Sequence, residues 1–174
     1  MKKILLLSDS HGYLDNNIIK HAKWSDEIWH AGDIGDIKIT DSLNSYSKVR
    51  AVYGNIDDSL TRDVFSKNIF FKCEGITVLI THIGGYPKRY SKGIPDLLNK
   101  YRPKLFISGH SHILKIIQDR KYNLLHINPG ACGIIGFHKK RTMVRFEINN
   151  KKIENFYVID LGNRSSINGN DSKI

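Results

Sequence analysis

Cysteine and long apolar runs are scarce in this chain of 174 residues. Its two cysteines, Cys73 and Cys132, lack CxxC spacing and are too few for the disulfide framework of a small secreted domain. We therefore expect two buried free thiols and a cytoplasmic location. The opening segment MKKILLLSDSHG has only four consecutive apolar residues, Ile4 to Leu7, which is too short for a secretory leader or a membrane span. We expect a first β-strand there and no membrane partner.

The chain also lacks internal repeats and linker-like interior segments, so its length favours a single domain. Apolar residues make up 40% and charged residues 25%, which is ordinary for a globular protein and too apolar for general disorder. From Gly162 onwards the sequence GNRSSINGNDSKI is polar and rich in glycine, asparagine and serine. These features predict one domain over residues 1–161 and a disordered tail over residues 162–174.

Acidic residues are the scarcer charged type: 17 Asp and Glu stand against 27 Lys and Arg, which gives a net charge of +10. Such an excess attracts anionic substrates, and it would indicate nucleic-acid binding if the cations formed a stripe. They occur instead in short scattered runs, at residues 2–3, 88–89, 139–141 and 151–152. A nucleic-acid partner is therefore not favoured, although it stays open.

Five apolar, β-rich runs each stop at a small residue followed by a polar one: KILLLSDSH, EIWHAGD, VRAVYGN, ITVLITH and KLFISGHSH. Helical candidates lie between them at residues 14–20, 37–46 and 94–101, the last closed off by Pro103. Later runs, ILKIIQDRKYNLLHI, RTMVRFEI and KKIENFYVI, have short connections that indicate hairpins. The pattern predicts an α/β fold of two packed sheets with helices on their outer faces, in one domain.

Polar side chains follow all five strand ends, which is where ligands bind in open α/β sheets. They comprise two carboxylates, one amide and four imidazoles, a set suited to Mn, Fe, Zn, Ni or Mg. Seven ligands exceed what one ion takes while keeping an open position, so we expect two divalent cations bridged by a carboxylate. The seven residues are Asp9, His11, Asp33, Asn55, His82, His110 and His112.

Each of these side chains alone is weak evidence for a metal site, because a single histidine at a strand end is more often a core or surface residue than a metal ligand. Five concordant strand ends are harder to explain as packing, since unpaired carboxylates and imidazoles at one sheet edge would cost several kcal/mol without a counter-charge. His110 and His112, two residues apart, can reach neighbouring ions from one loop. Two carboxylates against two divalent cations leave an electropositive site able to hold a phosphate.

The ordered motifs SDSHG, HAGDIGD, YGNID, THIGG and SGHSH, followed by INPGACG, resemble the calcineurin-like metallophosphoesterases. The chain is most similar to the small, capless bacterial and archaeal phosphodiesterases of the YfcE type, over residues 2 to about 146. This resemblance implies a single-domain αββα sandwich without a cap. It also implies a water that bridges the two ions, ionises and attacks phosphorus in line, with Mn the first choice among the candidate metals.

The resemblance further assigns the ligands. Asp9, His11 and His112 would hold the first ion. Asp33 would bridge, and Asn55, His82 and His110 would hold the second. Asp9, Asp33, Asn55 and His82 are the implied catalytic residues.

The third motif departs from many family members, which have a histidine after Gly-Asn to assist the leaving group or orient the phosphate. Here that position is Ile56, which can do neither. The small phosphodiesterases commonly lack this histidine too, so the departure resembles a subgroup trait. It predicts weak catalysis on esters with poor leaving groups, and Asp57 is expected to be structural.

Other residues receive weaker interpretations. His30 is expected to support the ligands or fill the core, His126 to be buried in a strand, and His21 and His138 to lie on the surface. The loop GGYPKRYSKG, residues 84–93, could bind the non-reacting part of a phosphodiester through Lys88 and Arg89, with Asn55 also touching substrate. A plain solvated turn explains that loop equally well.

The leading hypothesis is therefore a metal-dependent phosphodiesterase acting on a small-molecule phosphodiester. Alternatives are a phosphomonoesterase or a nuclease of the same fold, or a protein-interaction scaffold like the retromer subunit whose metal site is degraded. All seven expected ligand positions carry residues that can bind a metal, which favours an enzyme over a scaffold. The substrate, the native metal and the oligomeric state, a homodimer included, are not fixed by the sequence.

Overall fold

The computed structural model describes residues 1–166 of the chain. Regular structure continues past the predicted domain boundary at residue 161, because strand β12 (Lys152–Asn163) is followed by a short 3₁₀ helix, η1 (Arg164–Ser166). The remainder of the predicted tail, residues 167–174, lies outside the described residues.

The first sheet has five strands in the order β12-β11-β1-β2-β3. Strands β1, β2 and β3 run parallel, whereas β11 pairs antiparallel with β1 and β12 pairs antiparallel with β11. The bounds are β1 Lys2–Leu7, β2 Glu27–His30, β3 Lys48–Ala51 and β11 Lys140–Asn149. The predicted hairpin near the carboxyl end of the chain is therefore confirmed.

The second sheet also has five strands, in the order β4-β5-β8-β10-β9. Its central strands β5, β8 and β10 are parallel, and β4 and β9 form antiparallel edges. The bounds are β4 Asn68–Cys73, β5 Ile76–Thr81, β8 Leu105–Ile107, β9 Leu114–Asp119 and β10 Leu124–Pro129. A small hairpin, β6 (Gly85–Tyr86) and β7 (Arg89–Tyr90), lies within the loop GGYPKRYSKG.

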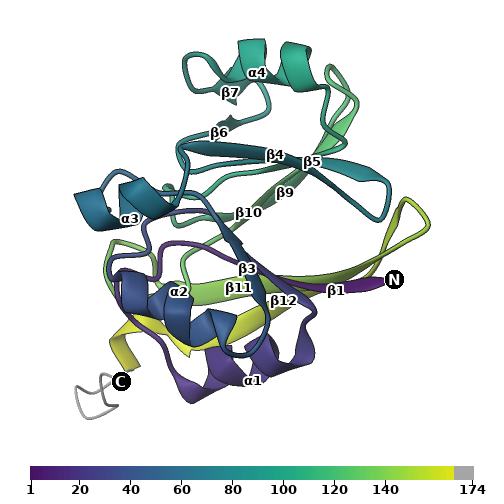
Figure 1. Cartoon of the computed structure of the whole chain (residues 1–174). Helices are drawn as coiled ribbons and strands as arrows, with labels where there is room; N and C mark the ends of the chain where they lie inside the picture. The colour runs from purple at the N-terminus through teal and green to yellow at the C-terminus, as the bar shows by residue number, and fades with distance from the viewer. Residues whose placement is uncertain (167–174) are drawn as a thin grey trace.

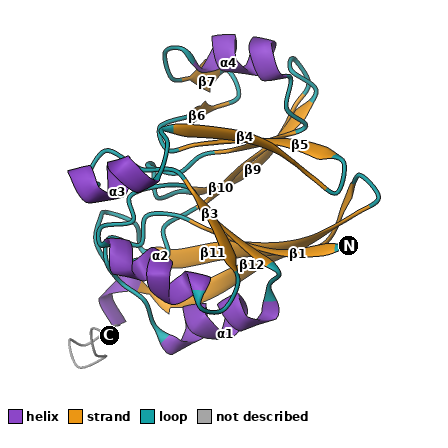
Figure 2. Cartoon of the chain, viewed as in Figure 1, coloured by secondary structure: helices purple, strands orange, loops and turns teal. Residues whose placement is uncertain are grey.

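Helices flank the two stacked sheets (Figures 1 and 2). Helices α1 (Asn16–Trp24) and α2 (Ile37–Asn44) cover the outer face of the first sheet, and α4 (Ile94–Tyr101) covers that of the second. The two-sheet sandwich expected from the sequence is confirmed. Helix α1 begins two residues later than predicted because the Asp15 carboxylate caps it, accepting the Ile18 N–H at 2.9 Å.

The sequence did not indicate strand β4, the short helix α3 (Ser59–Val64) or the β6–β7 hairpin. Helix α3 buries only Thr61, so its sequence lacks the periodic apolar pattern from which a helix is predicted. Strand β4 forms one of the two antiparallel edges of the second sheet.

Alternation along each central strand builds the core on both faces of the sheets. In β1, Ile4 and Leu6 face the second sheet, and Leu5 and Leu7 face α1 and α2. All four are fully buried, which explains why β1 reads as an unbroken apolar run rather than an alternating one. Each such side chain contributes roughly 1.5–3 kcal/mol of burial free energy. This packing fixes the sheet edges from which the polar loops leave.

Both cysteines are buried and free, as expected. Burial raises the pKa of the Cys73 thiol to about 11 and that of Cys132 to about 12, so both stay protonated near neutral pH. Within residues 1–166, no helix has the length and apolarity needed to cross a membrane.

Candidate metal centre

The polar loops that end the parallel strands meet where the two sheets pack together. The first sheet supplies three of these loops, and the second supplies two. Asp9 and His11 follow β1, Asp33 follows β2, Asn55 follows β3, His82 follows β5, and His110 and His112 follow β8. The structure thus brings together all seven residues predicted from the strand ends, six of them in two groups of three and Asn55 beside the second group.

The first group consists of Asp9, His11 and His112, whose candidate ligand atoms all lie within 4.8 Å of one another. The His112 Nε2 atom lies 3.3 Å from the Asp9 Oδ1 atom and 3.3 Å from the His11 Nε2 atom. Asp9 is fully buried, so its charge is shielded from water and acts at close range.

The second group consists of Asp33, His82 and His110, again with candidate ligand atoms within 4.8 Å of one another. The His82 Nε2 atom lies 3.3 Å from Asp33 Oδ1 and 3.1 Å from the side-chain oxygen of Asn55. Asn55 therefore adjoins this group, as the family resemblance implied. Asp33 and His82 are buried, whereas His110 and Asn55 are exposed.

Asp33 lies between the two groups. One carboxylate oxygen, Oδ1, faces His82 at 3.3 Å, and the other, Oδ2, faces the Nε2 atom of His11 at 3.9 Å. A carboxylate with one oxygen toward each group is placed to serve two cations at once.

The ring orientation of His82 is set by the first sheet. Its Nδ1 lies 2.8 Å from the Ala31 carbonyl oxygen, which only accepts, so Nδ1 donates a proton there and Nε2 is the nitrogen that faces Asp33 and Asn55. Burial alone would lower the pKa of His82, but the hydrogen bond to Asp33 and the charges of Asp9 and Asp33 outweigh it and raise that pKa. The centre therefore favours positive charge.

Backbone strain is concentrated at these loops. Five of the seven residues adopt left-handed backbone conformations, with φ between 48° and 67°. Such conformations cost non-glycine residues roughly 1–2 kcal/mol each, and they persist only where surrounding contacts impose them. The five are Asp9, His11, Asp33, His110 and His112.

The loop between His110 and His112 is held by contacts on both sides. A Cβ atom at Gly109 would lie 2.1 Å from the Ser8 hydroxyl oxygen, so only glycine permits this approach. From β10, the Asn128 amide donates to the Gly109 carbonyl at 2.7 Å and to the Ser111 hydroxyl at 3.1 Å. The motif INPGACG, through Asn128, thus supports the loop that carries His110 and His112.

Two further interpretations from the sequence agree with the structure. His30 is fully buried and its Nε2 lies 2.8 Å from the Ser10 hydroxyl; burial lowers its pKa to about 4. Asp57 accepts the amide N–H groups of Gly35 at 2.8 Å and Gly54 at 2.7 Å, so it ties two of the polar loops together.

His138 is partly exposed, in line with the surface position expected for it, but its Nδ1 also lies 3.1 Å from the Nδ1 of His112, a contact that the sequence did not indicate. His21 is partly exposed as well, on α1. Nothing in the local sequence FHKK marks His138, because the contact depends on how the loop between β10 and β11 folds back. His126, in contrast, is fully buried in β10 as expected.

Lys88 and Arg89 are exposed on the β6–β7 hairpin. They line a cavity of about 840 Å³ together with Lys115, and no residue of the two ligand groups lines it. Another cavity, of about 650 Å³, is lined by Asn55 and His82. The structure therefore does not bring Lys88 and Arg89 together with the seven polar residues.

The donor set fits divalent cations. In each group, imidazole nitrogens and a carboxylate oxygen lie within 4.8 Å of one another, close enough to share one cation. Neither group contains a thiolate, which favours Mn, Fe, Zn, Ni or Mg.

Comparison with known proteins agrees with this chemistry. The family model of the calcineurin-like phosphoesterase superfamily domain matches residues 1–151. A curated relative, a probable metallophosphoesterase of Mycoplasma pneumoniae, is 31% identical over 145 residues, which cover 77% of this chain and 81% of the relative. The chain belongs to the calcineurin-like phosphoesterase superfamily. The resemblance carried by the five motifs is confirmed.

Solved structures share the fold. Wild-type Vps29 from Entamoeba histolytica, complexed with zinc, has a TM-score of 0.70 at 14% identity and covers 91% of this chain and 98% of its own. An archaeal phosphodiesterase has a TM-score of 0.68 at 20% identity, over 91% of this chain and 99% of its own. A protein of Streptococcus pneumoniae has a TM-score of 0.67 at 21% identity, over 94% and 90%. At these identities the likeness shows the fold alone.

Proposed function

We propose that this protein is a metal-dependent phosphodiesterase that uses two divalent cations. The observation that carries the proposal is the pair of ligand groups on either side of the Asp33 carboxylate. Membership of the phosphoesterase family supports hydrolysis of a phosphate ester. We propose manganese as the first cation to test and the cytoplasm, where thiols stay reduced, as the location.

In this proposal Asp9, His11 and His112 hold one cation, and Asn55, His82 and His110 hold the other, with Asp33 shared between them. When bound, the two cations would activate a water molecule and neutralise charge on the phosphoryl oxygens. Asp9 and Asp33 supply the negative charge that retains the cations. The Ala31 carbonyl orients the ring of His82. The Asp57 carboxylate holds the neighbouring loops by accepting their backbone N–H groups.

The substrate's non-reacting part would enter the cavity lined by Asn55 and His82, because this cavity reaches the ligand groups. Its wall includes the cationic residues Arg62 and Lys67, which suit an anionic ester. The Arg62 guanidinium donates to the Asn55 carbonyl at 3.0 Å, so it lies beside the centre. We keep the sequence-based proposal for Lys88 and Arg89, restricted to large diesters that extend from the centre to the hairpin.

The alternative functions use the same fold but predict different results in an activity assay. A phosphomonoesterase or nuclease of the same fold would use the same cations on a different ester. A scaffold like the retromer subunit would need no turnover, and structural likeness to Vps29 keeps that alternative in view. The complete set of seven ligands is the feature that favours catalysis over a scaffold role.

The deciding experiment strips the protein of metal and assays it with cations added back one at a time. We expect bis(p-nitrophenyl) phosphate to be hydrolysed with manganese and to remain intact with chelator. p-Nitrophenyl phosphate and a labelled oligonucleotide serve as the monoester and nuclease substrates in the same assay. Faster turnover of either would replace the diesterase proposal. No turnover of any ester with any cation would support the scaffold.

A further inference from the structure

His138 makes two contacts with groups of opposite hydrogen-bonding character. Its Nε2 lies 3.1 Å from the Gly133 carbonyl oxygen, and its Nδ1 lies 3.1 Å from the Nδ1 of His112. The two rings are steeply inclined, with centroids 5.0 Å apart and planes at 72°. The contact is therefore edge to edge through nitrogen rather than a stack of ring faces.

These contacts determine which nitrogens carry protons. A carbonyl oxygen can only accept, so Nε2 of His138 must donate and its Nδ1 is left with a lone pair. That lone pair accepts the Nδ1 proton of His112. A neutral His112 protonated on Nδ1 has its own lone pair on Nε2, the atom that lies 3.3 Å from Asp9 Oδ1 in the first ligand group.

The loop is shaped to permit this contact. Gly136 has a φ of 128°, and a Cβ atom there would lie 2.2 Å from the Nδ1 of His112, so a side chain would displace the ring from His138. Arg164, in η1, donates from Nε to the His138 carbonyl at 3.0 Å. The Gly133 amide donates to the carbonyl of Asp9 at 3.1 Å, which ties the same loop to the first group.

We propose that His138 is a positioning residue for the first cation: it fixes His112 in the tautomer and orientation that present Nε2 as a ligand. The inference rests on the proposed function, since it needs a cation at the first group. Histidine ligands in proteins generally donate their second nitrogen to a carboxylate, a carbonyl or water. Here another imidazole, itself oriented by Gly133, accepts that proton.

Two substitutions separate the hydrogen bond from packing. His138→Phe keeps a ring of similar size and removes the acceptor, whereas His138→Asn keeps an acceptor oxygen near the position of Nδ1. The matched control is His21→Phe on α1, which contacts neither ligand group. Manganese binding to the metal-free proteins is followed by calorimetric titration, and the ring tautomers are read from ¹⁵N–¹H NMR spectra.

We expect wild type and His21→Phe to bind two cations. His138→Phe should bind one cation about 10- to 100-fold more weakly while the other site is unchanged, and His138→Asn should regain most of the affinity. The His112 signals should show protonated Nδ1 in wild type and a mixture of tautomers in His138→Phe. Unchanged affinity in His138→Phe, or equal weakening by Phe and Asn, would overturn this inference alone. A wild-type protein that binds no cation would overturn the proposed function as well.

Discussion

The Nε2 atoms of His11 and His112 lie 3.3 Å apart, although 101 residues separate the two histidines in the sequence. His11 leaves the first sheet and His112 leaves the second, so the first ligand group forms only when the two sheets pack against each other. A cation bound there would add its binding free energy to the stability of the folded chain, because the unfolded chain lacks the site.

Asp33→Asn should remove both cations. The substitution keeps the shape of the side chain but takes away the charge that faces both groups, so we expect fewer than one manganese per chain after desalting and kcat at least about 100-fold lower. Metal content is measured by atomic emission and kcat with bis(p-nitrophenyl) phosphate.

His110→Ala is the matched comparison for Asp33→Asn. It removes a ligand of the second group only, so one cation per chain should remain. Equal metal loss in both variants would argue against a shared carboxylate. Circular dichroism confirms that each variant is folded.

The position of Ile56 predicts a strong dependence on the leaving group. Its side chain is exposed beside the centre and carries no proton to transfer. Alkyl phosphodiesters should therefore turn over at least about 100-fold more slowly than aryl ones, since proton donation is typically worth 10²- to 10⁴-fold. Ile56→His should narrow this gap. Equal kcat for aryl and alkyl diesters in the wild type would contradict the prediction.

Cationic residues in the two cavities should affect KM differently. Arg62→Ala/Lys67→Ala should raise KM for small and large diesters alike, by about twofold to fivefold, because exposed ion pairs are weak. Lys88→Ala/Arg89→Ala should raise KM only for a large diester that reaches the hairpin.

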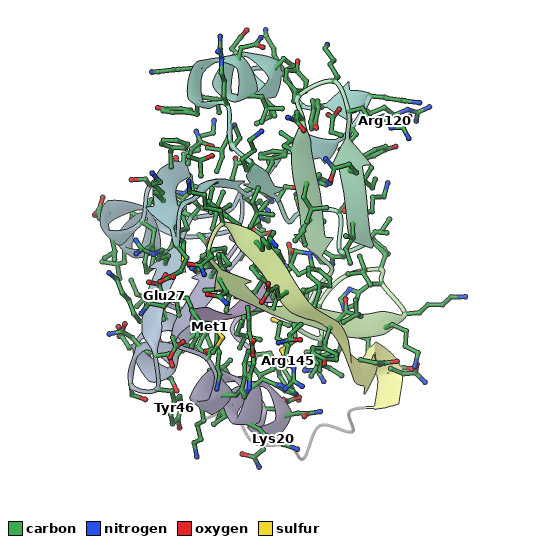
Figure 3. The ribbon with its side chains drawn as sticks, turned by 90° about the vertical axis from the view of Figure 1, so that its right-hand side faces the viewer. Met1, Lys20, Glu27, Tyr46, Arg120 and Arg145 are labelled. Atoms are coloured by element: carbon green, nitrogen blue, oxygen red, sulfur yellow. The ribbon has the colours of Figure 1, made fainter. Side chains whose placement is uncertain are left out.

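Lys20→Ala/Lys23→Ala on α1 is the control for lost positive charge. Figure 3 shows Lys20 at the opposite end of the molecule from Arg120, which lines the same cavity as Lys88. If the Lys88→Ala/Arg89→Ala variant has the same KM as this control for every diester, the proposal for Lys88 and Arg89 is wrong.

His126 should make the metal-free protein less stable as the pH falls. Burial lowers its pKa from 6.5 to about 4, so below pH 6.5 the unfolded chain takes up a proton that the folded protein does not. This histidine alone should lower the free energy of unfolding by roughly 2 kcal/mol between pH 7 and pH 5. Urea unfolding of wild type and His126→Phe at both pH values measures the effect. A pH dependence that is the same in both proteins would show that His126 does not contribute.

The sequence showed which polar residues follow the ends of the strands because that signal is local. A buried strand has a recognisable apolar run, and the small residue and polar residue after it mark its end, so Asp9, Asp33 and His82 could each be placed at the end of a strand without coordinates. The order of the strands within the sheets and the division of ligands into two groups depend on long-range pairing. No local pattern encodes that pairing.

What the sequence did not predict depends on contacts between distant segments. The contact between His138 and His112 depends on how the loop between β10 and β11 folds, and no local sequence pattern indicates it. Helix α3 has too few buried residues for a periodic pattern. Lys88 and Arg89 follow a ligand closely in the sequence, but the β6–β7 hairpin directs them into a separate cavity.

Anomalous X-ray scattering from crystals grown with excess manganese tests the central claim most directly. We predict two manganese peaks, one among Asp9, His11 and His112 and one among Asn55, His82 and His110, with Asp33 in contact with both. A single peak, or ligand atoms spread beyond coordination distance around no peak at all, would contradict a two-cation centre.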